Sequence, residues 1–371
     1  MEKRSSRNQN GPILQLVRKF IRFFRNYRQW SNKTFIMVLL IVVAISMALT
    51  LLAEGLKGIP LVNSSATTVS QTADSKEKNT ATEQETSARI MANGDLLYHD
   101  IIYISAKKAD GTYDFHENFE YVKPWLKQAD LVIGDFEGTV NKDHYLAGYP
   151  LFNAPGEVMD AIKDAGYQVL DLAHNHILDS QIEGVVSTAD AIEKAGMTPI
   201  GVYTHEPRDK APIVIKEVNG IKVAILAYSY GFNGIEQSIS QEDYNRYLSD
   251  LDEDKMKAEI ERAEKEADIT IIMPQMGVEY QIEPTEEQKK LYHKMIDWGA
   301  DIIFGGHPHV VEPAETVEKE GDKKLIIYSM GNFISNQRIE TMQDVENAKW
   351  TERGVLMDVT IKKKSGKTTI E

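Results

Sequence analysis

The sequence predicts an α/β protein with a large, mixed β-sheet component. Short apolar runs rich in Ile, Val and Leu alternate with segments of helical periodicity, as they do in α/β folds. Two further segments have the pattern of β-hairpins, which a purely parallel sheet would not contain. The chain has 371 residues, enough for one large globular core and additional segments.

Five buried strands are predicted, because their apolar runs have strand length and are bounded by polar residues or glycine. They cover residues 89–94, 130–135, 167–173, 268–274 and 300–306. The two hairpins are predicted over residues 211–230, with Asn219-Gly220 as the turn, and over 354–371, with Gly366 near the turn.

Four helices are predicted from their apolar periodicity and their end signals. They cover residues 156–166, 185–196, 254–267 and 284–300. The last segment begins with Pro284 and has an acidic first turn, and both features favour a helix N-terminus.

The N-terminal region differs from the rest of the chain in composition. Residues 34–53 contain no charge and would span about 30 Å as a helix, the thickness of the hydrocarbon core of a bilayer. Basic residues precede this run and Glu54 follows it. The positive-inside rule therefore predicts a single-pass anchor in the cell membrane, with a cytoplasmic N-terminus and an extracellular C-terminal domain. A cleaved signal peptide is the alternative, for which the apolar run is long.

Two segments flank the predicted anchor. Residues 1–33 are predicted to be a basic amphipathic segment on the anionic inner leaflet, or a polar extension of the anchor without a role of its own. Residues 54–88 are predicted to be a flexible linker, because residues 61–88 contain eleven Ser/Thr and no aromatic residue. The folded domain is predicted to cover residues 89–371.

Charge and cysteine content exclude several classes of protein. Residues 1–53 contain nine Lys/Arg and one Glu, a net charge of +8, and the whole chain carries −14, so the remainder carries −22. A domain this acidic repels the phosphate backbone, which excludes nucleic acid as a partner. The chain has no cysteine, so a metal site must use nitrogen and oxygen ligands.

Side chains that can bind a hard or borderline metal ion follow four of the predicted strands. In chain order they are Asp95, then Asp135 and Glu137, then His174, Asn175 and His176, then His307 and His309. Because the loops at the carboxyl ends of strands converge on one crevice in α/β sheets, these groups are expected to meet there. Together they predict a metal centre, although each cluster alone would be a weak signal.

The remaining histidines have no comparable neighbours at strand ends. Ordinary surface roles are expected for His99, His116, His144, His205 and His293.

The order of these motifs resembles the calcineurin-like metallophosphoesterase pattern. More closely, the stretches NGD, GDFEG, HNHILD, GVEY, GGHPHVVEP and YSMGNFISNQ resemble the bacterial capsule synthesis family, the poly-γ-glutamate biosynthesis proteins of the CapA/PgsA type. The resemblance covers roughly residues 89–340. It implies a metallophosphoesterase-like four-layer sandwich, in which two mixed β-sheets pack face to face and helices flank them.

The resemblance also implies a centre for one or two divalent metal ions, Mn, Fe or Zn. Asp135 would be the bridging carboxylate. Asp95 and His309 would bind one ion, and Asn175 and His307 would bind the other.

Three further residues are implied near the metal ions. His176 would act as a general acid or contact a phosphate, and Asp179 would orient it. Glu279 would be either a carboxylate of the site or a polar strand end.

The sequence departs from the two patterns at two positions. Leu97 stands where phosphoesterases usually have a histidine, and Glu137 could supply the missing ligand. Gln275-Met276 stands where the capsule family usually has His-Trp. An amide oxygen is a weaker ligand than imidazole for these metals, so a second ion bound by Gln275 would be held loosely or not at all.

Three functions remain open at this point. The resemblance implies an extracytoplasmic component of poly-γ-glutamate biosynthesis and export, which would contact this or another anionic envelope polymer and the integral-membrane synthase subunits. The metal ligands alone also allow a metal-dependent hydrolase of an envelope phosphodiester or of the polymer. Leu97 and Gln275 allow a non-catalytic binding module with a degenerate site.

Overall fold

The computed structural model describes residues 85–371. The predicted amphipathic segment and anchor, and nearly all of the predicted linker, lie outside these residues. Within the described part of the chain, no helix is both long enough and apolar enough to cross a bilayer. The first strand begins at Thr86, close to the predicted start of the folded domain.

The described residues form two mixed β-sheets. The seven-stranded sheet has the order β13-β12-β1-β2-β3-β4, with β11 also paired to β1. Its strands are β1 (Thr86–Leu96), β2 (Leu131–Asp135), β3 (Val169–Asp171), β4 (Thr198–Ile200), β11 (Asn332–Ile334), β12 (Leu356–Lys364) and β13 (Lys367–Ile370). The six-stranded sheet has the order β5-β6-β7-β8-β10-β9. Its strands are β5 (Val214–Val218), β6 (Ile221–Ser229), β7 (Ile269–Gln275), β8 (Ile302–Phe304), β9 (Ala314–Lys319) and β10 (Asp322–Ile327).

Helices connect the strands and cover the sheets. The α-helices of the described residues are α3 (Asp100–Ser105), α4 (Lys123–Leu126), α5 (Val158–Ala165), α6 (Gln181–Lys194), α7 (Gln241–Tyr247), α8 (Glu253–Glu266) and α9 (Glu286–Trp298). Short 3-10 helices lie at His116–Phe119, Ile235–Ser238 and Ala348–Trp350. The α9 helix begins with a capping box, in which the Thr285 side chain accepts from the backbone N–H of Gln288 and the Gln288 side chain accepts from that of Thr285.

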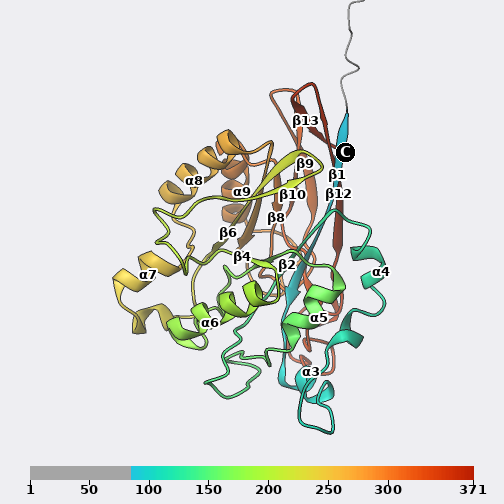
Figure 1. Ribbon diagram of the computed structural model, residues 1–371, viewed down its shortest axis with the longest axis vertical. Helices are drawn as coiled ribbons and strands as arrows, with labels where there is room; N and C mark the ends of the chain where they lie inside the picture. The colour runs from blue at the N-terminus through green and yellow to red at the C-terminus, as the bar shows by residue number, and fades with distance from the viewer. Residues whose placement is uncertain (1–84) are drawn as a thin grey trace, which may run out of the picture. The chain divides into compact units, whose positions relative to one another are not determined.

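Three hydrophobic cores stack the elements into four layers. In β1, Met91 packs with the α5 and α6 residues on one face, whereas Ile90 lies in the core between the two sheets. In β6, Val223 lies in the same central core, whereas Ala224 packs with α8 and α9 on the other outer face. Side chains alternate between the faces of a strand, so each sheet is apolar on both faces. Figure 1 shows α8 and α9 away from α5, with the strands between them.

The structure confirms the five predicted strands, the four predicted helices and the two hairpins. The turn of the first hairpin has positive φ at Asn219 (52°) and Gly220 (78°). A two-residue turn needs this conformation to match the right-handed twist of the strands that it joins. A third hairpin, β9–β10, was absent from the sequence prediction. Its first strand, Ala314–Lys319, alternates between exposed and half-buried residues and has no apolar run.

The strand register brings the chemically active ends together. Asp95 at the end of β1 pairs with Asp135 of β2, and Asp135 pairs with Asp171 of β3. In the second sheet, Gln275 at the end of β7 forms a bridge with Gly306, just beyond β8. The carboxyl ends of these parallel strands therefore form one edge, as the crevice argument predicts.

Candidate metal centre

The centre is built around Asp95, Glu137 and His309, whose ligand atoms all lie within 4.8 Å of one another. The Nδ1 atom of His309 lies 2.8 Å from Oδ2 of Asp95 and 3.8 Å from Oε2 of Glu137. All three residues are buried. The grouping places Glu137 beside the two residues that the family resemblance assigns to one ion.

Burial shapes the charge state of this cluster in the metal-free chain. It raises the pKa of Glu137 to about 7, an effect that His309 opposes and Asp95 reinforces. Burial alone would lower the pKa of His309, but Glu137 and Asp95 raise it to about 10. Burial, with repulsion from Asp171 and Asp95, also holds the pKa of Asp135 well above its usual range. A divalent cation would relieve this crowding of carboxylates.

The unsatisfied atoms of the centre test whether its residues fit a metal ion. Several buried ligand-type atoms have no hydrogen-bond partner among the described residues: Asp95 Oδ1, Asp135 Oδ1, Glu137 Oε1 and Oε2, Asn175 Oδ1, Gln275 Oε1 and His307 Nδ1. Leaving a buried polar atom unpaired costs about 1–3 kcal/mol. These are oxygen and imidazole donors of the kind that Mn, Fe and Zn accept, so the residues fit a divalent ion.

A second group of predicted ligands surrounds Asp135. The amide nitrogen of Gln275 donates a hydrogen bond to Oδ2 of Asp135, and Gln275 is buried. A Cβ at Gly306 would lie 2.7 Å from that nitrogen, so glycine leaves the space that the Gln275 side chain occupies. Asn175 donates from Nδ2 to Oδ1 of Asn233 over 3.2 Å, which leaves its own oxygen unpaired.

The two histidines of the HPH motif have unusual backbones. His307 has φ 95° and His309 has φ 60°, a region that side chains other than glycine rarely adopt. Such strain clusters at functional sites, where the surrounding structure enforces it. Burial lowers the pKa of His307 to about 3, and His309 and His176 contribute. The His307 imidazole is therefore neutral near pH 7, the form that binds metal ions.

His176 and Asp179 form a pair beside the metal-binding cluster. The Nδ1 atom of His176 lies 2.8 Å from Oδ2 of Asp179, which also accepts from the backbone N–H of Phe152 over 2.5 Å. Burial would lower the pKa of His176, but Asp179 and Glu137 raise it. His174 does not join them, because its ring nitrogens lie against backbone N–H groups, one of them that of Gly138.

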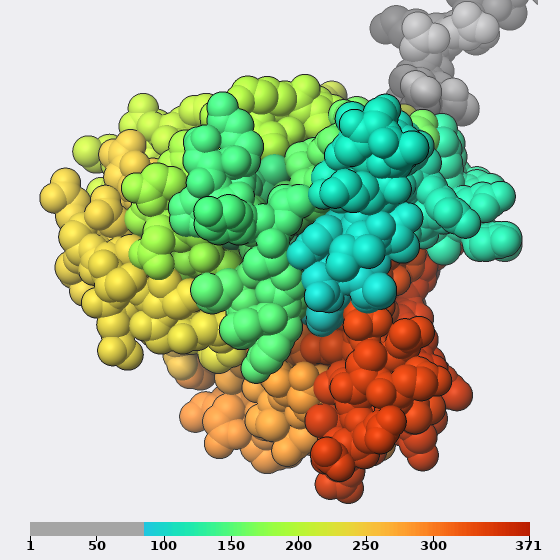
Figure 2. Space-filling view, turned by 90° about the horizontal axis from the view of Figure 1, so that it is seen from below, coloured from blue at the N-terminus to red at the C-terminus, as the bar shows by residue number. Residues whose placement is uncertain are grey.

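A cavity of about 590 Å³ opens onto the cluster. Its wall includes His176 and His309, the exposed Glu279, and Leu97 where phosphoesterases usually have a histidine. Figure 2 views the molecule from the α3 end; α3 (cyan) and the loop after β2 (green) lie next to one another on this face.

Two residues of this neighbourhood were missed or misjudged from the sequence. His99 was expected at the surface but is buried in the cavity wall, with its Nδ1 accepting from the backbone N–H of Asn336 over 3.2 Å. Asn332 also lies close to the centre, with its Oδ1 3.1 Å from Nδ1 of His309. Asn233 was missed, because it follows β6 in a loop without any ligand-type pattern.

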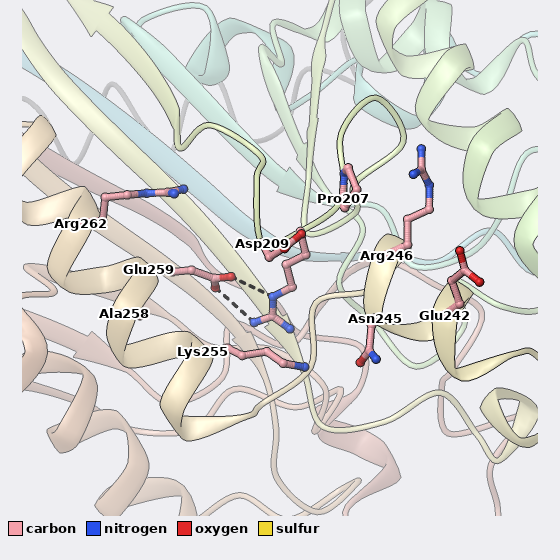
Figure 3. A pocket seen from close by; sticks show the side chains of 10 residues that line it. Pro207, Asp209, Glu242, Asn245, Arg246, Lys255, Ala258, Glu259 and Arg262 are labelled. Carbon is pink, nitrogen blue, oxygen red and sulfur yellow. Dashed lines mark hydrogen bonds and ion pairs between the residues drawn. The ribbon is translucent and has the colours of Figure 1, made fainter.

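A larger pocket of about 810 Å³ contains none of the predicted ligands. Arg208 is one of its lining residues and forms two hydrogen bonds to Glu259, with Nε–Oε1 at 2.8 Å and Nη2–Oε2 at 3.1 Å; Figure 3 draws them as dashed lines from the labelled Glu259. The guanidinium also donates to Asp250, and its side chain is only 3% exposed. This buried ion pair ties the loop before β5 to α8, so the pocket has a structural explanation.

A family model matches most of the described domain. The model of the family described as "Bacterial capsule synthesis protein PGA_cap" matches residues 89–337. The chain belongs to this family. The match includes every predicted ligand and the His176–Asp179 pair.

Two curated members of this group are similar in sequence. The "Capsule biosynthesis protein CapA" of Bacillus anthracis is 34% identical over 228 residues, 59% of this chain and 54% of that protein. The "PGA biosynthesis protein CapA" of Bacillus subtilis (strain 168) is 31% identical over 223 residues, 59% of this chain and 57% of that protein. The matched part of the PGA_cap chain thus spans a little over half the length of these relatives.

Solved structures with a related arrangement are more distant. A putative 5'-nucleotidase from Staphylococcus aureus has a TM-score of 0.47 at 13% identity, covering 77% of this chain and 53% of that one. The NAD nucleotidase of Haemophilus influenzae has a TM-score of 0.46 at 12% identity, covering 78% and 49%.

Proposed function

We propose that this PGA_cap protein is an extracytoplasmic component of poly-γ-glutamate capsule biosynthesis and export that carries a divalent-metal centre. Family membership supports the capsule role, because the two relatives are named for capsule and PGA biosynthesis. The buried cluster of Asp95, Glu137 and His309 is the observation that supports the metal centre. The proposed partners are the polymer, or another anionic envelope polymer, and integral-membrane synthase subunits.

The proposed location follows from the sequence. Residues 34–53 would anchor the chain, with residues 1–33 in the cytoplasm and the folded domain outside the cell. The −22 charge of the remainder opposes direct contact with polyglutamate unless cations bridge the two. A metal centre is one way to supply such cations.

The ligand assignment of the metal centre is also part of the proposal. Asp95, Glu137 and His309 would hold one ion, and Asp135 with His307 would take part in binding a second, helped by Asn175 and Gln275. When bound, a divalent ion would stabilise a developing oxyanion and lower the pKa of a water molecule.

A second candidate function is metal-dependent hydrolysis, and the His176–Asp179 pair favours it. Asp179 accepts a hydrogen bond from Nδ1 of His176. The other ring nitrogen, Nε2, is therefore available to carry a proton to a leaving group. His176 lines the cavity beside His309, where a substrate would bind. Glu279, at the mouth of this cavity, could contact the same substrate.

Gene deletion and metal analysis test the two parts of the proposal separately. In a polymer-producing strain that encodes this chain, deletion should abolish surface polymer, and the wild-type gene should restore it. Asp95→Asn and His309→Ala should fail to restore polymer and should bind less Mn²⁺ when purified.

The matched control is His293→Ala, since His293 is exposed and contacts only Glu315 in the described interactions, over 2.8 Å. It should restore polymer and keep its metal. Unchanged polymer after deletion contradicts the capsule role, and unchanged metal content in both ligand variants contradicts the centre.

A further inference from the structure

The chemistry of the cavity wall points to a class of ligand. None of the described residues that line this cavity is Lys or Arg. Apart from Glu279 and three histidines, its polar side chains are neutral, and four of them are amides: Asn175, Asn233, Asn336 and Gln337. Amides both donate and accept hydrogen bonds, so they match hydroxyl and amide groups and give no net attraction to an anion.

Flat aromatic surfaces complete the wall. Tyr280 stacks on His309 with ring centroids 6.0 Å apart and an interplanar angle of 28°. Phe152 contacts His99 and His176 edge to face, with ring centroids 5.0 and 4.7 Å apart, respectively. Tyr149 is 79% exposed at the mouth of the cavity. Aromatic walls with a few fixed polar groups favour ligands that present apolar faces and hydrogen-bonding edges.

The charges near the cavity oppose a ligand with many carboxylates. Glu279 is an exposed carboxylate in the wall, and Asp95, Asp135 and Glu137 lie buried behind it. Two like charges about 6 Å apart repel by about 1–3 kcal/mol at effective dielectric constants between those of water and a protein surface. Metal ions would attract one anionic group at the centre, but the described wall offers no Lys or Arg to further carboxylates.

The chain does gather cations in a pocket, but at another place. Arg246, Lys255 and Arg262 line the larger pocket with Arg208, beside the carboxylates of Asp209, Glu242 and Glu259 (Figure 3). The absence of Lys and Arg from the described wall at the metal-binding cluster is therefore a local property and does not follow from a shortage of basic residues in the domain.

We infer that the cavity binds an uncharged chain of hydroxyl- and amide-bearing units, such as an amino-sugar oligosaccharide, which presents a single oxygen to the metal centre. The carboxylate-bearing interior of poly-γ-glutamate is excluded from it. This inference rests on the proposed metal centre and specifies its ligand. In capsule synthesis, the centre would then contact a neutral envelope glycan and leave the polymer interior to other surfaces.

Binding measurements on the full Mn²⁺-loaded chain test the inference with three probes. They are an N-acetylglucosamine tetramer, a γ-linked glutamate tetramer, and the γ-linked isoglutamine tetramer, which has the same backbone with neutral α-carboxamides in place of the α-carboxylates. Titration calorimetry should show binding of the sugar tetramer. The isoglutamine tetramer should bind at least about tenfold more tightly than the glutamate tetramer, a difference equivalent to about 1.4 kcal/mol.

Two variants connect binding to the wall. Tyr149→Ala should weaken binding of the sugar tetramer about tenfold without changing the Mn²⁺ content, since truncating an aromatic contact costs on the order of 1–2 kcal/mol. Tyr121→Ala is the matched control, because Tyr121 is 83% exposed and does not line the cavity. Glu279→Lys should reduce the difference in binding affinity between the charged and the neutral tetramer.

The inference is overturned if the glutamate tetramer binds as tightly as its neutral counterpart, or if the sugar tetramer does not bind. It is also overturned if Tyr149→Ala and Tyr121→Ala bind the sugar tetramer equally. Each of these results leaves the capsule and metal proposals standing, because those depend on surface polymer and Mn²⁺ content.

Discussion

Replacing Gln275 by histidine is the sharpest test of the second metal position. In the described structure the amide nitrogen of Gln275 donates to Asp135, while the amide oxygen is buried without a partner. A hydrogen bond to a charged group contributes about 1.5–3 kcal/mol, and the unpaired oxygen costs about 1–3 kcal/mol. The wild-type arrangement is therefore close to neutral for stability in the metal-free chain.

Histidine has opposite effects on stability without and with metal. Without metal, Gln275→His removes both the bond and the unpaired amide oxygen but leaves the buried Asp135 carboxyl without its donor, so the free energy of unfolding should fall by about 1–3 kcal/mol. With Mn²⁺, the imidazole adds a stronger ligand beside His307, so the second ion should bind about tenfold or more tightly. Binding at one hundred times the dissociation constant adds about 2.7 kcal/mol of stability and offsets most of the loss.

The assay combines metal content after dialysis with urea unfolding in EDTA and in Mn²⁺. Gln288→His is the matched control, because Gln288 is also buried and donates to a carboxylate, Glu312, over 2.7 Å. The control should lose stability in both conditions and keep the wild-type metal content. If Gln275→His behaves like the control, Gln275 does not belong to a metal position.

Four other outcomes follow from the same geometry. His309→Ala should remove most bound metal, measured by mass spectrometry of the purified chain, because it deletes the ligand 2.8 Å from Asp95. Burial raises the pKa of Glu137 from 4.5 to about 7, so in EDTA its contribution to stability is present below about pH 4.5 and is lost as pH rises through about 7. Urea unfolding should therefore show a fall of about 3 kcal/mol in the free energy of unfolding over this range, and Glu137→Gln should abolish the fall. If the centre is hydrolytic, Asp179→Asn should shift the His176-dependent limb of the pH–rate profile to lower pH, because the hydrogen bond from His176 to Asp179 raises the pKa of His176; an unmoved limb would contradict that pairing. Gly94→Ala should destabilise the fold by about 2 kcal/mol or more in chemical unfolding, since its Cβ would lie 2.0 Å from the carbonyl oxygen of Gly331.

The central strands were predictable from the sequence because a strand that is buried on both faces appears as a continuous apolar run. Residues 268–274 form an apolar run, and the structure has β7 at Ile269–Gln275. The β9–β10 hairpin has no such pattern, since its edge strand Ala314–Lys319 alternates exposed and half-buried residues and contains no apolar run. Predictions for residues 1–84 remain predictions, because the structure describes residues 85–371.

The site was predictable to the extent that its ligands follow strand ends. The strand ends predicted that Asp95 and Asp135 lie close together, and the parallel pairing of β1 and β2 places them side by side; their role as ligands remains a prediction. His99 was misjudged, because its burial depends on Phe152 from a distant loop, a contact that sequence spacing does not encode. The Gln275–Asp135 bond likewise joins the two sheets, so only the packing of one sheet on the other reveals it.

The course of β1 has a mechanical consequence. The preceding chain joins the domain at Thr86, and Asp95 lies at the far end of the same strand, about 30 Å away at the usual rise per residue. Between them, eight residues from Thr86 to Asn93 pair with β12, and β2 flanks the other side. A pull on the N-terminal attachment would load these hydrogen bonds in shear, all at once, instead of opening them one by one. Tension would therefore be taken up along the ladder before it could displace Asp95 from its neighbours.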